Sequence, residues 1–535
     1  MLKADVDERF REACRRIGRI IAEENLREAE RIEKLKLVIA KTYGLNRVPS
    51  NLEVLESLPA ELRERVSGIL VKKPVKTISG VSIITVMTPI FECPHGRCAY
   101  CPGGRPAKSP RSYTGEEESV KLAEKVGYNP YLQVKSQLSK LERMGHRVDK
   151  VELIFIGGTF NAMPQGMQRW FVKRCLDALN SVDSDSLADA LAKAEEKPLH
   201  RVSGITVETR PDWVKPPQAN SLLEMGVTRV EIGVQAPDDE IYKLISRGHS
   251  VEDVVEATRT LKDLAFKVGY HLMPNLPGSS IEKDLEMYRM LWEDSRFRPD
   301  MLKIYPTLVL PGTLLYQWWR QGLYKSYTDE QLIKLLAEWF LMTPPYVRIQ
   351  RVQREIPLHL ASSGNKVANL RDAVEKYLRE RGLRCRCIRC REAGHRLLKD
   401  GVRAEEENIR LKTLRYEASG GEEYFISYED YVNDVLIGFI RLRNPSQVLR
   451  EELRAAALVR ELHVYGRMTP VGSQRIDESW QHRSYGSKLL AEAERIAVEE
   501  LDARKIVVIS GVGVRRYYYR HGYRLDGPYV SKRLR

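Results

Sequence analysis

The segment VELIFIGGTF (151–160) shows the pattern on which the fold depends, an apolar run of strand length that ends in a bend of small residues. Five similar strand-length runs lie around 82–88 and at 204–209, 229–234, 267–273 and 300–306. Amphipathic segments of helix length separate them, such as VEDVVEATRTLKDLA and IEKDLEMYRMLWEDS. Strands that alternate with helices pair in parallel through right-handed crossovers. Because six such units are fewer than the eight of a closed barrel, we predict a partial (β/α)6 TIM-like barrel that is open on one side.

The rest of the chain divides into parts of different composition, so we predict a multidomain α/β protein. Residues 1–75 read as a basic helical segment and 76–365 as the barrel. Residues 366–405 form a charged, cysteine-rich linker with little apolar content. Residues 406–535 begin with four strand-length runs and continue with a long helix and another strand, which predicts a separate α+β domain.

The modest excess of positive charge usually means only a solvated surface, but its distribution along the chain also suits contact with a polyanion. The 535 residues include 87 basic and 73 acidic side chains, a net charge of +14. We find no run of about 18 apolar residues, and the first residues are charged where a signal peptide would be apolar. We therefore expect a cytoplasmic protein that does not enter a membrane. Basic residues cluster at 11–19 and at 379–399, which favours nucleic acid because phosphate contacts release counterions.

Three cysteines follow the first predicted strand in FECPHGRCAYCPGG (91–104). Cys93, Cys98 and Cys101 form a C-x4-C-x2-C array, and clustered cysteines in a reducing compartment favour metal over disulfides. A structural zinc site requires a fourth ligand, for which His95 is the nearest residue. A plant-type ferredoxin cluster requires a distant fourth cysteine, and Cys175 is the only one that could supply it locally.

A third interpretation of this array is a four-iron cluster with three thiolate ligands. Its fourth iron is then open to the amino and carboxylate groups of S-adenosylmethionine. Tyr100 precedes the last ligand, as in the radical S-adenosylmethionine pattern, although that superfamily more often has three residues in the first gap. The position after a barrel strand also suits a site, so we favour this interpretation.

Polar and small residues end several successive strands of the predicted barrel. Gly157, Gly158 and Thr159 follow the second strand, where small residues let a ligand approach the backbone. Glu208 lies near the end of the third strand and Gln235 ends the fourth. These residues are our candidates for binding S-adenosylmethionine.

The stretch WQHRSYGSKLLAEAERIA (480–497) resembles the pyrophosphate loop of the GNAT acetyltransferases, with the pattern Q/R-x-x-G-x-G/A. Gln481 and Gly486 fit this pattern, whereas Ser484 occupies the place of the first Gly. The N–H groups of Ser484, Tyr485 and Gly486 at the start of a helix are expected to face the phosphates of coenzyme A. If the position requires a positive φ, serine costs about 1 kcal/mol there.

Two further segments of this domain fit an acetyl-CoA site. The strand ELHVYG (461–466) is expected to pair with the pantetheine arm through its backbone. Tyr517 and Tyr518 in RRYYYRHGY are expected to place a phenol near the thioester and are our candidate catalytic residues. The alternative is a packed tyrosine-rich helix.

A second cysteine group lies in RCRCIRCREAGH (384–395). Thiolates of Cys385, Cys387 and Cys390, surrounded by arginines, are expected to bind zinc. His395 is the nearest fourth ligand, and His359 is the other candidate. We expect the zinc to have a structural role in a linker with little apolar content.

The whole chain from about residue 70 resembles the catalytic subunit of Elongator. The resemblance rests on CPHGRCAYCPGG, RSYTGEE, VDKVELIFIGGTF, GITVETRPD, RVQREIP, RELHVYG, QHRSYG and ISGVGVRRYYYRHGY. It implies a tRNA uridine acetyltransferase that forms 5-carboxymethyluridine at the wobble position, with a basic N-terminal segment that binds tRNA. It implies acetyl-CoA contacts at Lys150, Glu461, Leu462, His463, Val464, Ser484, Tyr485, Gly486 and Tyr517. Elongator-like subunits or a homodimer are the partners that it suggests.

The resemblance explains why two such domains share one chain. C5 of uracil is a poor nucleophile, and ordinary acyl transfer does not join it to the acetyl methyl carbon. A cluster reduced by an electron donor cleaves S-adenosylmethionine to a 5′-deoxyadenosyl radical, which is expected to abstract a hydrogen atom from that methyl group. The carbon radical then adds to C5, and hydrolysis of the thioester leaves a carboxymethyl group. We expect the anticodon loop to enter a cleft between the domains as single-stranded RNA.

Two other functions fit parts of this pattern. One is a protein lysine acetyltransferase of the histone type with a structural iron–sulfur cluster. The other is a non-catalytic tRNA-binding scaffold in which Ser484 has ended the use of acetyl-CoA.

Overall fold

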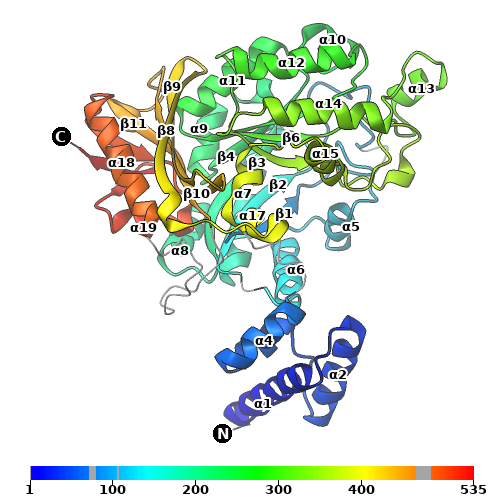
Figure 1. Cartoon of the computed structure of the whole chain (residues 1–535), viewed down its shortest axis with the longest axis vertical. Helices are drawn as coiled ribbons and strands as arrows, with labels where there is room; N and C mark the ends of the chain where they lie inside the picture. Colours follow the sequence, from blue (N-terminus) through cyan, green and yellow to red (C-terminus); the bar gives the residue numbers. More distant parts are fainter. Residues whose placement is uncertain (1, 72–79, 105–107, 147, 466–483, 535) are drawn as a thin grey trace.

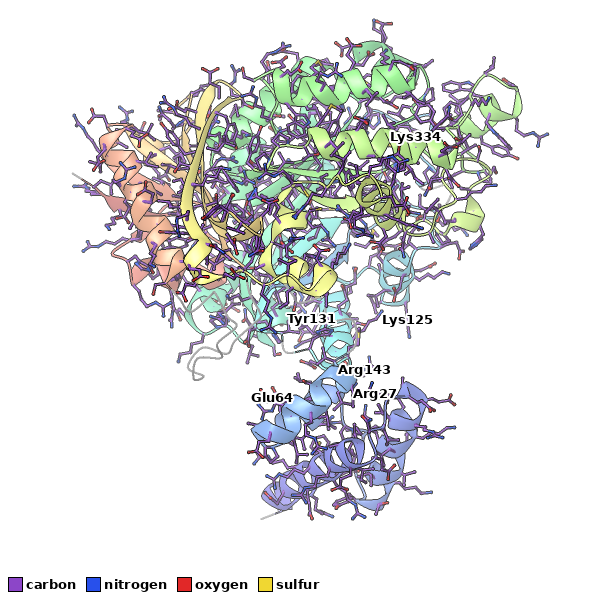
Figure 2. The ribbon with its side chains drawn as sticks, viewed as in Figure 1. Arg27, Glu64, Lys125, Tyr131, Arg143 and Lys334 are labelled. Atoms are coloured by element: carbon purple, nitrogen blue, oxygen red, sulfur yellow. The ribbon has the colours of Figure 1, made fainter. Side chains whose placement is uncertain are left out.

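The computed structural model describes residues 2–71, 80–104, 108–146, 148–465 and 484–534. The N-terminal part is a small unit of four helices, which projects from the rest of the molecule in Figure 1. They are α1 (Leu2–Glu23), α2 (Ala29–Thr42), α3 (Asn51–Glu56) and α4 (Ala60–Leu70). Their apolar faces form a core of their own, and a capping box of Ser50 and Glu53 starts α3. Arg27 and Glu64 lie on this unit, and Arg143 lies where the helix α6 (Pro130–Arg143) approaches it (Figure 2).

The exposed face of α1 carries the basic cluster at 11–19. Arg11, Arg15, Arg16 and Arg19 are all exposed, whereas Ile17 between them is buried in the unit's core. The 3.6-residue period of the helix thus separates an apolar face from a cationic one.

The barrel contains seven parallel strands in the order of the chain. They are β1 (Ser82–Met87), β2 (Lys150–Ile156), β3 (Arg201–Thr209), β4 (Arg229–Gln235), β5 (Lys267–Leu272), β6 (Met301–Ile304) and β7 (Arg348–Val352). Helices cover the outside of this sheet: α5 (Glu118–Lys125), α6 (Pro130–Arg143), α7 (Gln165–Asn180), α8 (Leu187–Glu196), α9 (Pro216–Glu224), α10 (Asp239–Leu244), α11 (Val251–Asp263), α12 (Ile281–Glu293), α13 (Leu314–Arg320) and α14 (Asp329–Met342). The predicted partial barrel is confirmed.

The seventh strand is one more than the sequence pattern predicts. Its sequence, RIQRV (348–352), has three polar residues among five in place of the apolar run of the other strands. The strand lies at the edge of the sheet, and four of its five residues are only half-buried. A strand with one partner and a solvated side has no need of a continuous apolar run, so the apolar-run criterion missed it.

The linker forms three short helices, α15 (Leu370–Arg379), α16 (Ile388–Arg391) and α17 (Ala393–Asp400). A second sheet follows, in the order β13-β14-β12-β11-β10-β9-β8. Its strands are β8 (Ile409–Ala418), β9 (Gly421–Asp430), β10 (Val435–Asn444), β11 (Ala456–Val464), β12 (Lys505–Val508), β13 (Arg524–Asp526) and β14 (Tyr529–Arg533), with helices α18 (Tyr485–Glu499) and α19 (Arg515–Tyr519). β11 and β12 are parallel, and the other pairs are antiparallel.

A buried ion network holds this second sheet against the barrel. Arg460 of β11 donates to Asp300 of the barrel at 2.6 and 2.8 Å and to Glu423 of β9 at 2.8 and 3.2 Å. Arg443 of β10 donates to Asp263 at the end of α11 at 2.6 and 2.8 Å. All five side chains are at most 1% exposed, so their charges are stabilised by one another and not by water.

A second junction joins the start of β3 to the loop after β12. An added Cβ on Gly511 would lie 2.3 Å from the Ser203 carbonyl oxygen, and one on Gly513 would lie 2.4 Å from the Val202 nitrogen. Only glycine permits these backbones to approach so closely. Two rigid contacts therefore fix the acetyltransferase-like sheet relative to the barrel, side by side in Figure 1.

No helix in the described parts of the chain is both long and apolar enough to cross a bilayer.

Candidate functional site

The loop after β1 brings Cys93, Cys98 and Cys101 to one end of a cavity. Cys98 and Cys101 are buried, and Cys93 is half-buried. The Ser112 N–H donates to Cys101 Sγ at 3.3 Å, and the buried Arg247 guanidinium lies 3.6 Å from Cys98 Sγ. Both groups are hydrogen-bond donors that face sulfur, as suits a set of cysteines that binds metal through its sulfur atoms.

The structure also places Cys175 and His95, the two residues considered as a fourth metal ligand for these thiols. Cys175 is fully buried on α7 in the barrel's apolar core, so it does not complete a ferredoxin set at this loop. His95 does lie beside the loop, with its Nε2 3.1 Å from Cys98 Sγ, and burial lowers its pKa to about 3. Three thiolates without a fourth cysteine fit a cluster with one open iron.

The bend after β2 requires glycine. Gly157 and Gly158 have φ values of +122° and +128°, and a Cβ on Gly157 would lie 2.4 Å from Thr88 Oγ1. Gly158 and Thr159 line the cavity, whereas Gly157 lies behind them against Thr88. The Thr88 hydroxyl is buried and has no hydrogen-bond partner among the described residues. The bend thus presents backbone groups to the cavity beside the cysteine loop.

Glu208 and Gln235 line the same cavity from the ends of β3 and β4. Gln235 has a positive φ of +70°, a strained conformation that is common where a side chain is held for function. Thr209 Oγ1 beside Glu208 is buried and lacks a partner among the described residues. The unpaired hydroxyls of Thr88 after β1 and Thr209 at the end of β3 fit a polar ligand at this end of the barrel.

A cluster of charged side chains inside the barrel was missed in the sequence. Oxygen and nitrogen atoms of Glu208, Glu231 and His271 all lie within 4.8 Å of one another. The Lys303 ammonium contacts Glu231 and lies 3.1 Å from Glu208, so it supplies the positive charge that a metal would bring. Burial opposes ionisation, but Lys303 and Arg229 hold the pKa of Glu231 well below its usual range. Polar residues inside strands that should be apolar were the available signal.

In the second sheet, the two parallel strands β11 and β12 separate before β11 ends. β11 and β12 pair only from Ala456 to Val459, while β11 continues to Val464 beside β10. The backbone from Glu461 onward therefore faces a gap, as the expected pantetheine contact requires. Glu461, Leu462, His463 and Val464 all line the cavity, and burial lowers the pKa of His463 to about 4.

Ser484 starts α18 in the left-handed conformation, with φ +62° and ψ +13°. The GNAT loop pattern has a glycine at this position, which suits a left-handed conformation. Ser484 adopts that conformation at a cost of about 1 kcal/mol. Ser484 and Gly486 line the cavity, whereas Tyr485 is buried and packs its ring 4.9 Å from that of Tyr428. Gln481 lies outside the described residues.

The hydroxyl of Tyr517 projects over the start of α18. A Cβ on Gly486 would lie 2.7 Å from Tyr517 Oη, and this buried oxygen has no well-oriented hydrogen-bond partner among the described residues. Burial raises the pKa of Tyr517, which keeps it a neutral donor. Tyr518 is more deeply buried against the ring of Tyr523. A buried hydroxyl without a well-oriented partner at the start of a helix fits coenzyme A.

One cavity of about 1790 Å³ contains both groups of residues. The cysteine loop and the ends of β2, β3 and β4 line one part, and β11, the start of α18 and Tyr517 line the other. Lys150 of β2 lies between the two domains on its wall, and burial lowers the pKa of this lysine. The structure therefore brings together nearly all residues that the sequence assigned to two separate ligands.

The second cysteine group is compact. The Sγ atoms of Cys385, Cys387 and Cys390 lie within 4.8 Å of one another. Burial opposes ionisation of Cys387, but hydrogen bonds from the other two thiols and the nearby Arg371 hold its pKa well below the usual range. Three thiols this close together fit zinc.

Neither predicted fourth ligand joins these thiols. His395 Nε2 lies 3.1 Å from the Glu392 carboxylate, which in turn contacts Arg348 on the cavity wall. His359 is exposed in a short turn of 3-10 helix. Glu392 and His395 are three residues apart in a helical stretch, a spacing at which two side chains meet.

Comparisons with known proteins agree with this architecture. Four family models match successive parts of the chain: the ELP3 N-terminal domain at 10–78, the Radical SAM superfamily at 87–291, the Radical_SAM C-terminal domain at 299–380 and the Acetyltransferase (GNAT) family at 389–523.

Curated relatives match over nearly the full length. The tRNA uridine(34) acetyltransferase of Methanocaldococcus jannaschii is 45% identical over 515 residues, which cover 95% of this chain and 94% of that protein. Human Elongator complex protein 3 is 41% identical, over 94% and 93% of the two chains. A structure of Methanocaldococcus infernus Elp3 with an N-terminal deletion has a TM-score of 0.76 at 45% identity and covers 85% of this chain and 100% of its own. The chain belongs to the family of the tRNA uridine(34) acetyltransferases and Elongator complex protein 3.

Proposed function

We propose that this enzyme forms 5-carboxymethyluridine at the wobble position of tRNA from acetyl-CoA and S-adenosylmethionine. The observation that carries the proposal is the continuous cavity, which is lined by the cysteine loop at one part and by Tyr517 and Ser484 at the other. A C–C bond between an acetyl methyl group and C5 of uracil requires both reactants in one water-poor space. A lysine acetyltransferase has no such need, because its acceptor attacks the thioester directly.

Cys93, Cys98 and Cys101 are the residues that would hold a [4Fe–4S] cluster, with S-adenosylmethionine at its open iron. When bound, this pair supplies a 5′-deoxyadenosyl radical that can remove a hydrogen atom from the acetyl methyl group. The bend at Gly158 and Thr159 offers backbone groups to S-adenosylmethionine, and Glu208 and Gln235 offer side chains from the next strands. Arg247 offsets the negative charge of the thiolates.

Acetyl-CoA lies, in this proposal, between β11 and β12. The N–H groups of Tyr485 and Gly486 at the start of α18 bind the pyrophosphate, since the left-handed Ser484 turns the chain into the helix there. The backbone from Glu461 to Val464 binds the pantetheine arm. Tyr517 donates its unpaired hydroxyl to the ligand, and Lys150 attracts its negative groups from the barrel side.

The tRNA meets a basic rim around the cavity. The basic residues of its lining include Lys121, Lys125, Lys197, Arg201, Arg516 and Arg520. The exposed arginines of α1 add a second cationic surface on the projecting helical unit. Phosphates bound at both places release counterions, so the affinity for tRNA falls steeply with salt.

Zinc at Cys385, Cys387 and Cys390 is proposed to be structural. The linker helices line the cavity with Arg389, Glu392 and His395, although the segment has few apolar residues to fix it. A metal that ties three thiols therefore stabilises part of the cavity wall.

The test measures release of coenzyme A from acetyl-CoA by reconstituted protein with tRNA, with a lysine-rich histone peptide, or with neither. We expect tRNA to stimulate release and the peptide to have no effect. In parallel, the Cys98→Ala variant should yield no carboxymethyluridine while still binding acetyl-CoA. Stimulation by the peptide alone would support the lysine acetyltransferase, and carboxymethyluridine made by Cys98→Ala would refute the role of the cysteine loop.

A further inference from the structure

The cysteine loop has an outer face that the cavity does not use. On this side the Ala99 carbonyl accepts a hydrogen bond from the Leu315 N–H at 2.9 Å. The Arg97 guanidinium donates to the Cys101 carbonyl at 2.8 Å and to the Gly312 carbonyl at 2.9 Å. Helix α13 is thus bonded directly to the backbone between the second and third cysteines, and it forms the layer between them and the surface.

The outside of this layer is apolar and aromatic. Leu323 is 74% exposed, the largest value among the exposed large hydrophobic side chains of the described residues, and Leu314 is 43% exposed. Tyr316, Trp318 and Trp319 are half-buried, and they pack on an apolar cluster that contains Cys98, Cys101 and Leu315. We call Leu314, Tyr316, Trp318, Trp319 and Leu323 the α13 patch. Such a group of aromatic and leucine side chains at the surface is typical of an interface.

The segment that contains the α13 patch and the segment of the cysteine loop carry charges of one sign. No Asp or Glu occurs between Pro311 and Thr328 or between Cys93 and Gly115. Arg97, Arg320 and Lys325 are exposed, and none of them forms an ion pair with a described residue. A basic rim around an apolar centre is complementary to an acidic protein. Figure 1 shows α13 at the edge of the barrel, away from the second sheet.

The proposed function requires an electron from outside the chain for each cleavage of S-adenosylmethionine. The cavity side of the cysteine loop is occupied by the reactants in that proposal. Because electron tunnelling falls steeply with distance, a donor has to bind where little protein separates the cluster from the surface. The α13 patch meets this condition, since Tyr316, Trp318 and Trp319 pack on the apolar cluster that contains Cys98 and Cys101.

We propose that the α13 patch is the docking surface for an acidic one-electron carrier protein of the flavodoxin or ferredoxin class. This inference rests on the proposed function. The reduced carrier loses one electron and becomes oxidised, and the cluster held by the three cysteines gains that electron. The aromatic centre of the patch supplies affinity, and the arginines and the lysine orient the carrier.

The test uses the full chain with its reconstituted cluster and flavodoxin in its hydroquinone form. The double variant Arg320→Glu with Leu323→Glu changes two exposed side chains that touch no ligand. We expect the rate of cluster reduction by flavodoxin, followed by the electron paramagnetic resonance signal of the reduced cluster, to fall at least tenfold. Calorimetric binding of flavodoxin should weaken by a similar factor, and raising the salt should slow reduction of the wild type. The matched control is Arg454→Glu with Leu525→Glu, two exposed residues of the second sheet's domain.

Dithionite separates the two proposals, because it reaches the cluster without docking. Both double variants should give the wild-type signal and wild-type product with dithionite. Unchanged reduction by flavodoxin in the α13 variant would overturn the docking surface, as would a change of its oligomeric state, which would assign the patch to self-association. Absence of product from the wild type with dithionite would instead overturn the proposed function, while flavodoxin binding would still report on the patch.

Discussion

Replacement of Arg460 by methionine tests the buried network between the domains. The guanidinium makes hydrogen bonds of 2.6 to 3.2 Å to Asp300 and Glu423 and donates to the Phe266 carbonyl at 2.8 Å. Methionine fills similar space but leaves two buried carboxylates with fewer cations. Removing one partner of a buried ion pair costs about 3–5 kcal/mol, and we expect the lower end because Lys262 lies 3.8 Å from Asp300.

The loss of folding stability in Arg460→Met should depend on pH, and the buried charges determine the direction of that dependence. Burial opposes ionisation of Asp300, but Arg460 and Lys262 hold its pKa well below the usual range. In the wild type this contributes stability above the pKa of the unfolded state, and the contribution is lost as the pH falls through the folded pKa. Without Arg460 the folded pKa of Asp300 rises, so the deficit of the variant should shrink between about pH 7 and about pH 4.

The assay is urea unfolding of both proteins at several pH values, followed by tyrosine and tryptophan fluorescence. The control is Arg454→Met, because Arg454 forms a surface pair with Glu451 at 2.9 Å and is 71% exposed. A surface pair of this kind is worth less than about 1 kcal/mol. Equal losses in the two variants, or a deficit for Arg460→Met that grows on acidification, would refute the reasoning.

Three further substitutions test separate parts of the site. Gly157→Ala places a Cβ 2.4 Å from Thr88 Oγ1 at a φ of +122°. Backbone strain of this kind costs about 1–3 kcal/mol. The variant should therefore bind S-adenosylmethionine about tenfold more weakly, while its iron content stays unchanged. Gly166→Ala in α7, with no atom within 4 Å, is its control, and equal affinity in both variants would contradict a role for the bend. Tyr517→Phe removes a buried hydroxyl that has no well-oriented partner among the described residues, so the Kd for acetyl-CoA measured by calorimetry should rise about three- to tenfold. An unchanged Kd would mean that this hydroxyl does not contact the ligand. Cys387→Ser should lower the zinc content by elemental analysis and the Tm by several degrees, and full zinc retention would argue against this thiol as a ligand.

The barrel was predictable from the sequence because its strands are buried on both faces. Runs such as VELIFI read as strands in any context, and the residues that follow them gather at one end of a parallel sheet. The strand β7 was missed because an edge strand tolerates Arg348 and Gln350. The candidate ligands at Gly158, Glu208 and Gln235 were found by the same logic, since chain order gives the position of each strand end.

The contacts between the domains were beyond sequence reasoning. Arg460 and Asp300 are 160 residues apart, and nothing in either segment indicates that the two charges are buried together. The cluster of Glu231, His271 and Lys303 was overlooked because each residue alone is an ordinary polar interruption of a strand. His395 was assigned by nearness along the chain, whereas the helical turn directs it to Glu392.

The most direct test of the central claim uses acetyl-CoA whose methyl group carries three deuterium atoms. The reconstituted protein is incubated with this substrate, tRNA, S-adenosylmethionine and a reductant, and the nucleosides are analysed by mass spectrometry. If the acetyl methyl group is activated in the shared cavity, one deuterium appears in 5′-deoxyadenosine and two remain in carboxymethyluridine at the wobble position. Carboxymethyluridine that retains no deuterium, or 5′-deoxyadenosine that gains none while the product forms, would contradict the account.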